Sequence, residues 1–234
     1  MIEGQSTAVL AIGGHAADME FTCGAVIAKY TSEGHRAVLL HCTLGEKGNR
    51  RKAPQEYERQ KRAEALEAAR VLGAEVRILE YHDNGLPCND AAAFAIATVI
   101  REVRPEIVVT HWKGSHHKDH RNAHLNTLDA LAYAAHDGFP VEGVPHRVRA
   151  VYFAENWEDS LDFAPDLLVD VSDAFERWHE ACSAYELFRG GISPFDFDGY
   201  YSALLRMRGC LARVRYAVGL KRRPSLHAGR VSRL

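Results

Sequence analysis

Short apolar runs alternate with longer amphipathic segments through the first two thirds of the chain. The apolar runs have the length and composition of buried strands, and they predict strands at 7–14, 36–43, 75–81, 106–112 and 147–155. The intervening segments carry apolar residues at helical spacing, and they predict helices at 18–33, 55–73, 90–104 and 118–135. This alternation predicts an α/β fold with a mainly parallel sheet, right-handed crossovers and helices on both faces.

The last third of the chain has a different pattern. Residues 166–172 predict a short additional strand, and 173–189 and 199–218 predict helices. No linker separates this part from the rest, so we expect an α/β extension packed on the same Rossmann-like sheet. We therefore expect one domain over residues 1–220, followed by a basic tail at 221–234.

Composition excludes several classes of protein. The 234 residues are 47% hydrophobic and carry a formal net charge of −2, so nothing at whole-chain level indicates a nucleic-acid partner. The first residues lack the basic segment of a signal peptide, and no apolar run is long enough to span a membrane. The five cysteines are widely separated and odd in number, which favours reduced thiols in a cytoplasmic protein.

Candidate metal ligands follow two of the predicted strands. His15 and Asp18 come after the first strand, and the histidine-rich segment 111–120 comes at the end of the fourth. In open α/β sheets, ligands bind beyond the carboxyl ends of the strands, at the point where the strand order reverses. An order of 3-2-1-4-5 makes the first and fourth strands neighbours at that point. The predicted topology therefore brings the two groups together.

Two histidines and one carboxylate that leave open positions are typical of catalytic zinc sites and of Fe²⁺ triads. His15 and Asp18 are three residues apart across a tight turn, so both can reach one ion. Spacing leaves the third ligand open, because His117 and His120 are three apart across a helix start, and His120 and His124 are four apart on one helical face. The simpler alternative is that Asp18 caps a helix and that the histidine-rich segment, which also holds His116, is ordinary surface.

Several short motifs together resemble one known family. The segment GGHAADMEFTCGA resembles the AHPDDE…GG signature of the LmbE-like / PIG-L family of zinc-dependent N-acetylglucosaminyl deacetylases. TLGEKG resembles that family's TxGExG loop, YHDNGL its DxxL segment, and HKDH its HPDH motif. The order and spacing of these segments extend the resemblance over roughly residues 6–205.

The resemblance implies hydrolysis of an N-acetyl amide on an amino sugar or sugar conjugate, by a protein that forms homo-oligomers. It places His15, Asp18 and His120 on the metal ligands, which hold Zn²⁺ in the family and would also suit Fe²⁺. His117 falls on a histidine that assists the tetrahedral intermediate, and Asp119 falls on the residue that orients this histidine.

Two more residues match active-site positions of the closer bacterial members of the family. They are Arg147, in the segment PHRV, and Tyr200, in the segment DGYY.

The sequence departs from the family pattern at the general base. The resemblance implies an aspartate two residues after the first ligand, and this position is Ala17; the following glutamate position is Met19. Three interpretations follow: a deacetylase whose base comes from elsewhere, such as Glu46, His117 or Tyr200; a relative recruited to another metal-assisted hydrolysis; or a non-catalytic protein that binds a metal or a sugar.

Overall fold

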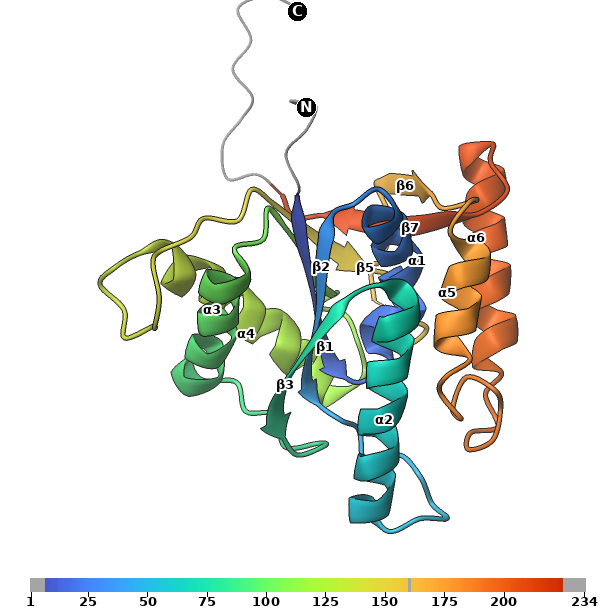
Figure 1. Cartoon of the computed structure of the whole chain (residues 1–234), viewed down its shortest axis with the longest axis horizontal. Helices are drawn as coiled ribbons and strands as arrows, with labels where there is room; N and C mark the ends of the chain where they lie inside the picture. The colour runs from blue at the N-terminus through green and yellow to red at the C-terminus, as the bar shows by residue number, and fades with distance from the viewer. Residues whose placement is uncertain (1–6, 160, 225–234) are drawn as a thin grey trace, which may run out of the picture.

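The computed structural model describes residues 7–159 and 161–224, which form one sheet covered by helices on both faces (Figure 1). The strands are β1 (Ala8–His15), β2 (Arg36–Thr43), β3 (Glu75–Tyr81), β4 (Ile107–His111), β5 (Ala150–Ala154), β6 (Leu167–Asp170) and β7 (Ala217–Arg222). The helices are α1 (Asp18–Ser32), α2 (Pro54–Leu72), α3 (Asp90–Val103), α4 (Lys118–Ala135), α5 (Phe175–Cys182) and α6 (Phe197–Ala212). Among the described helices, none combines the length and the apolar character needed to cross a bilayer.

The sheet has the strand order β3-β2-β1-β4-β5-β7-β6. The first five strands are parallel, which confirms the predicted α/β fold and the predicted 3-2-1-4-5 order. β7 is antiparallel to both of its neighbours, β5 and β6. The carboxyl ends of β1 and β4 therefore lie side by side at the reversal of strand order, where α/β sheets bind ligands.

Two apolar cores fill the space between the sheet and its helices. Along β1, Val9 and Ala11 belong to the core under α1, α2, α5 and α6, whereas Leu10 and Ile12 belong to the core under α3 and α4. Figure 1 shows these two helix groups on opposite sides of the sheet. Because successive strand residues point to opposite faces, a strand buried on both sides is a continuous apolar run, as its sequence indicated.

The C-terminal third corrects three predictions. The helix expected at 173–189 ends at Cys182 and continues as turns, and the helix expected at 199–218 ends at Ala212. Residues 217–222 form β7 instead, so the basic tail expected at 221–234 begins inside a strand. Residues 225–234 lie outside the described part of the chain.

Candidate metal centre

The candidate ligands meet at the carboxyl edge of the sheet. His15 is the last residue of β1 and is paired with Thr43, the last residue of β2. His111 ends β4, the other neighbour of β1, and His120 lies in the first turn of α4. Segments about a hundred residues apart in the sequence are thus adjacent here.

Three potential ligand atoms converge at this edge. His15 Nδ1 lies 3.2 Å from Asp18 Oδ2 and 3.0 Å from His120 Nε2. His120 Nε2 lies 3.1 Å from the same Asp18 oxygen. Tetrahedral ligands at about 2.0–2.1 Å from Zn²⁺ are separated by a little more than 3 Å, so these residues need to move little to hold one ion. A donor set of two imidazoles and one carboxylate therefore fits a divalent cation with open positions.

The second nitrogen of each imidazole faces an oxygen. His15 Nε2 lies 3.4 Å from Asp83 Oδ1 and 3.3 Å from Asp119 Oδ2. His120 Nδ1 lies 3.1 Å from Ser115 Oγ and 3.4 Å from Glu158 Oε2. Histidines that bind metals usually donate their other ring N–H to such a partner, which fixes the tautomer and the orientation of the ring.

The electrostatics of the cluster favour positive charge between these groups. Burial lowers the pKa of His15, but Asp18, Asp119 and Asp83 together outweigh it and raise the pKa well above the usual value. Burial raises the pKa of Asp18, but His120 and His15 outweigh it and bring the pKa well below the usual value. A buried carboxylate held ionised beside imidazoles is the condition in which a divalent cation binds.

His111 is a site residue that the sequence reasoning missed. Its Nε2 accepts a hydrogen bond from Gly14 N–H at 2.9 Å and lies 3.1 Å from Asp18 Oδ2. Its ring stacks on that of His120 with centroids 4.0 Å apart. Burial and the neighbouring His120 lower the pKa of His111 to about 3, so it stays neutral. Asp18, His111 and His120 are also close enough to share an ion, which makes His111 an alternative ligand.

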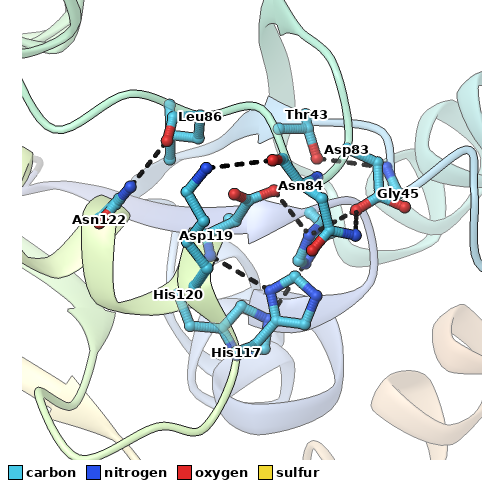
Figure 2. A network of polar contacts seen from close by, with 12 residues as sticks. Thr43, Gly45, Asp83, Asn84, Leu86, His117, Asp119, His120 and Asn122 are labelled. Atoms are coloured by element: carbon cyan, nitrogen blue, oxygen red, sulfur yellow. Dashed lines mark hydrogen bonds and ion pairs between the residues drawn. The ribbon is translucent and has the colours of Figure 1, made fainter.

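His117 lies beside the cluster but is not paired with a carboxylate as the resemblance implied. It precedes α4 as the N-cap residue, and its Nδ1 accepts the backbone N–H of Asp119 at 3.2 Å (Figure 2). Burial and the nearby imidazoles of His15 and His120 lower the pKa of His117 to about 4. The ring is therefore neutral, and because Nδ1 is an acceptor, the ring proton is on Nε2.

The carboxylate of Asp119 contacts His15 instead of His117. Asp119 is fully buried, and its Oδ2 accepts the backbone N–H of Asn84 at 2.7 Å (Figure 2). The same oxygen is the one that lies 3.3 Å from His15 Nε2. The prediction that Asp119 orients His117 through its carboxylate is therefore wrong in this structure, and the residue that it orients is His15.

Arg147 and Tyr200 are not brought to the cluster. Arg147 is exposed and precedes β5, so it lies at the amino edge of the parallel strands, opposite His15. Tyr200 packs on Phe195, and the pocket is lined by its neighbour Tyr201. Consecutive residues on a helix point about 100° apart, so an assignment shifted by one residue selects the wrong side chain.

The backbone around the cluster is closely packed. A Cβ on Gly14 would approach the His120 ring to 3.0 Å, and Gly45, at a φ of 74°, would place a Cβ 3.3 Å from that of His15. Ala17 has a φ of 90°, which side chains rarely tolerate. Hydrogen bonds fix both backbone polar groups of the preceding residue, Ala16. Its N–H donates to Thr43 O at 3.2 Å, and its carbonyl oxygen accepts from Lys61 Nζ at 2.7 Å.

A pocket of about 230 Å³ opens beside the ligand atoms. One part of its wall is polar and contains His15, Asp18, His117, His120, Lys61, Asp83 and Glu158. The remaining wall contains five aromatic residues, Phe21, Tyr57, Trp157, Phe197 and Tyr201. Of the three base candidates named from the sequence, His117 lines this pocket, and Tyr200 and Glu46 do not. Glu46 Oε1 instead accepts the backbone N–H of Asp83 at 3.0 Å.

A turn after β5 carries part of this wall. Asn156 N donates to Asp159 Oδ2 at 2.9 Å, and Asp159 N donates to Asn156 O at 2.9 Å. The turn places Trp157 and Glu158 in the pocket lining. Burial raises the pKa of Asp159 to about 7, against the opposing hydrogen bond from Asn156.

Replacing Asp159 by asparagine is expected to stabilise the protein at alkaline pH. A carboxyl group with a raised pKa in the folded state costs no stability below its unfolded pKa, and the cost grows as pH rises toward the folded value of about 7. Asparagine keeps the oxygen acceptor and carries no charge. We expect a gain on the order of 2 kcal/mol in the free energy of unfolding at pH 8, shrinking toward zero near pH 4.

Urea unfolding at several pH values measures this effect. Asp137→Asn, at an exposed position, is the matched control and should leave the pH dependence unchanged. A gain for Asp159→Asn that is equal at pH 4 and pH 8 would contradict the assignment.

Comparisons with known proteins agree with this architecture. The family model for GlcNAc-PI de-N-acetylase (PIG-L) matches residues 10–131. The 1D-myo-inositol 2-acetamido-2-deoxy-alpha-D-glucopyranoside deacetylase of Thermobifida fusca is 33% identical over 62% of this chain and 60% of its own length. The 4-oxalmesaconate hydratase of Pseudomonas putida is 25% identical over 87% of this chain and 80% of its own length. A conserved protein of Thermus thermophilus superposes with a TM-score of 0.82 at 28% identity, over 97% of this chain and 99% of its own.

The relatives differ in how much of them this chain spans. It matches about 60% of the length of the Thermobifida deacetylase and most of the length of the Pseudomonas hydratase. The same kind of scaffold thus belongs to proteins named for two different reactions.

Proposed function

The chain belongs to the PIG-L family, and from this premise we propose that it is a metal-dependent hydrolase that removes the N-acyl group of an amino sugar or sugar conjugate. We propose Zn²⁺ as the metal and His15, Asp18 and His120 as its ligands. The observation that carries the proposal is the convergence of their three ligand atoms within 3.0–3.2 Å of one another.

The surrounding residues support a catalytic role for this centre. Zinc, when bound, polarises an amide carbonyl and lowers the pKa of a water molecule to about 7. Asp83 and Asp119 lie against Nε2 of His15. Ser115 and Glu158 lie against Nδ1 of His120. These contacts leave the other nitrogen of each ring toward the proposed metal.

The neutral ring of His117 carries its proton on Nε2, so it can donate a hydrogen bond from that atom. With Nδ1 occupied by the N–H of Asp119, its Nε2–H is available to the pocket and can stabilise the oxyanion that develops as water attacks the carbonyl. A neutral donor of this kind needs no carboxylate partner, so the function we propose for His117 survives the loss of the expected pairing with Asp119.

The absence of the usual general base should lower the rate of hydrolysis. Ala17 presents a methyl group where the resemblance implies a carboxylate, and the general base usually contributes about 10²–10⁴ to the rate. Asp83 and Glu158 are the lining carboxylates other than Asp18 in the described part of the chain, and each already faces a ring nitrogen of His15 or His120. We therefore expect slow hydrolysis of simple N-acetyl substrates.

A second candidate function is the addition of water to a conjugated unsaturated carboxylate. It is favoured by the hydratase of Pseudomonas putida, which this chain matches over 87% of its residues. The absence of a carboxylate at position 17 fits this candidate because it removes the group that amide hydrolysis requires in the family.

One experiment separates the two candidates. Purified protein is loaded with zinc, its metal content is measured, and it is offered N-acetylglucosamine conjugates and conjugated unsaturated carboxylates in parallel. Release of a primary amine supports hydrolysis, and loss of ultraviolet absorbance without amine supports hydration. A protein that binds no divalent metal would contradict the proposed metal-dependent hydrolase.

A further inference from the structure

Part of the pocket lining is apolar although the pocket also contains the metal cluster. We define the apolar lobe as the lining residues Ala17, Phe21, Leu187, Phe197, Tyr201 and Trp157. Its first member, Ala17, directly precedes the proposed ligand Asp18 in the chain, and both line the same pocket. A substrate held at the cluster must therefore place part of itself against hydrocarbon.

The floor of the lobe is built from the first turn of α1. Phe21 N donates to Ala17 O at 2.9 Å, so the two residues are one helical turn apart and on the same face. The Phe21 ring packs with centroids 5.8 Å from those of both Phe197 and Tyr201. The aromatic rings support one another at ordinary packing distances, so the lobe is a preformed wall.

The alanine at position 17 determines the character of this floor. The resemblance implies an aspartate here, and its charge would need water or a partner within the lobe. With alanine, position 17 adds only a methyl group to the pocket lining next to Phe21. The same substitution that removes the family base thus creates room for hydrocarbon next to the reacting carbonyl.

The mouth of the lobe has an aromatic side chain that a ligand can cover. Trp157 is 39% exposed, and its ring stacks on Phe195 with centroids 4.4 Å apart. Its backbone N–H donates to Tyr201 Oη at 3.4 Å, so a hydrogen bond links these two residues of the lobe. Exposed aromatic surface that is continuous with a pocket is typical of a place where a ligand completes the packing.

We propose that the apolar lobe is an acyl subsite and that the substrate carries an acyl group longer than acetyl. This inference rests on the proposed function. In the reaction, the water oxygen forms a bond to the acyl carbon, the C–N bond breaks, and the two protons of the water pass to the leaving nitrogen. The products are an amine and a fatty carboxylate, with the carboxylate at the metal cluster and the chain in the lobe.

The test uses the carboxylate products as ligands, so it does not depend on turnover. Zinc-loaded protein is titrated by calorimetry with acetate, butyrate and hexanoate. Each buried methylene strengthens binding by up to about fourfold, and we expect hexanoate to bind at least about tenfold more tightly than acetate. Equal affinities, a weaker hexanoate complex, or no carboxylate binding to the zinc-loaded protein would overturn the proposal.

Two matched variants test whether the preference for hexanoate over acetate arises in the apolar lobe. Leu187→Asn places an amide in the lobe, whereas Leu66→Asn makes the same change on α2 at a leucine that is 55% exposed and does not line the pocket. We expect Leu187→Asn to weaken hexanoate binding by about fivefold or more and to leave acetate binding within about twofold. Equal losses for both ligands, or the same hexanoate loss in Leu66→Asn, would contradict an acyl subsite.

Failure of the subsite and failure of the proposed function give different results. A chain-length preference without amine release from N-hexanoyl glucosamine would retain the lobe as a subsite for an apolar carboxylate and reject the hydrolysis. Amine release from N-acetyl substrates together with equal carboxylate affinities would retain the hydrolysis and reject the acyl subsite.

Discussion

Replacing His120 by alanine is expected to abolish stoichiometric zinc binding and, with it, any hydrolysis. The Nε2 of His120 is one of three ligand atoms that lie within 3.0–3.2 Å of one another, so its loss leaves the centre with two of the three proposed ligands. Loss of a residue behind a ligand usually costs 10–100-fold in metal affinity or activity, and loss of the ligand itself should cost more. His15→Ala and Asp18→Ala are expected to behave in the same way.

His124→Ala is the matched control for this prediction. His124 is another buried histidine, one turn further along α4, whose Nδ1 lies 2.8 Å from His111 O rather than at the cluster. Metal content after dialysis, measured by plasma mass spectrometry, should be near one zinc per chain for His124→Ala and near zero for His120→Ala. The same outcome as for His124→Ala is expected for His116→Ala. Full occupancy in His120→Ala would refute the ligand assignment, and loss in Asp18→Ala and His120→Ala with retention in His15→Ala would favour His111 in place of His15.

Replacing Ala17 by aspartate is expected to raise the rate of N-acetyl hydrolysis by about 10²-fold or more, because it restores the group that serves as general base in the family. The backbone is already in place, since Ala17 is held at a φ of 90° by the contacts of Ala16. Aspartate tolerates a positive φ better than most residues, so the substitution should fold. Amine release from N-acetylglucosamine conjugates, with zinc present, is the measurement.

Ala17→Asn separates the base from the shape of the side chain. It has nearly the volume of aspartate and cannot accept a proton from water at neutral pH, so it should keep zinc and gain no activity. If Ala17→Asp binds zinc but hydrolyses no faster than Ala17→Asn, the scaffold has not merely lost a base, and the hydratase candidate is favoured. The acyl subsite adds a second expectation, because a carboxylate in the lobe should weaken hexanoate binding more than acetate binding.

The sequence alone was enough to predict the strand order and the meeting of His15, Asp18 and His120. Five apolar runs separated by amphipathic helices permit few parallel topologies, and each of these topologies gathers the residues that follow the strands at one edge. The motif resemblance then chose His120 from a segment with several histidines, a choice that spacing did not allow. The structure brings these three side chains together.

The details that the sequence could not predict depend on where side chains point and on which strands pair, and not on the order of residues in the chain. Asp119 lies beside His117 in the chain, but its carboxylate turns to His15, and which neighbour it contacts is decided by the rotamer and by the N–H of Asn84. His111 begins the histidine-rich segment, but as the last residue of an apolar strand it was not singled out as a candidate ligand. β7 pairs with strands more than forty residues earlier, and local patterns carry no information about such pairing.

The position of β7 also orders events during synthesis. The five parallel strands can assemble as they leave the ribosome, but β6 has no partner until β7 arrives, because β7 separates it from β5 in the sheet. Until then β5 is an open sheet edge, and its last residue, Ala154, which later pairs with Leu220, stands just before the turn that carries Trp157. A nascent chain that stops before residue 217 would therefore expose the unpaired edge of β5 close to the turn that carries Trp157. Synthesis of β7 covers this edge and gives β6 its partner.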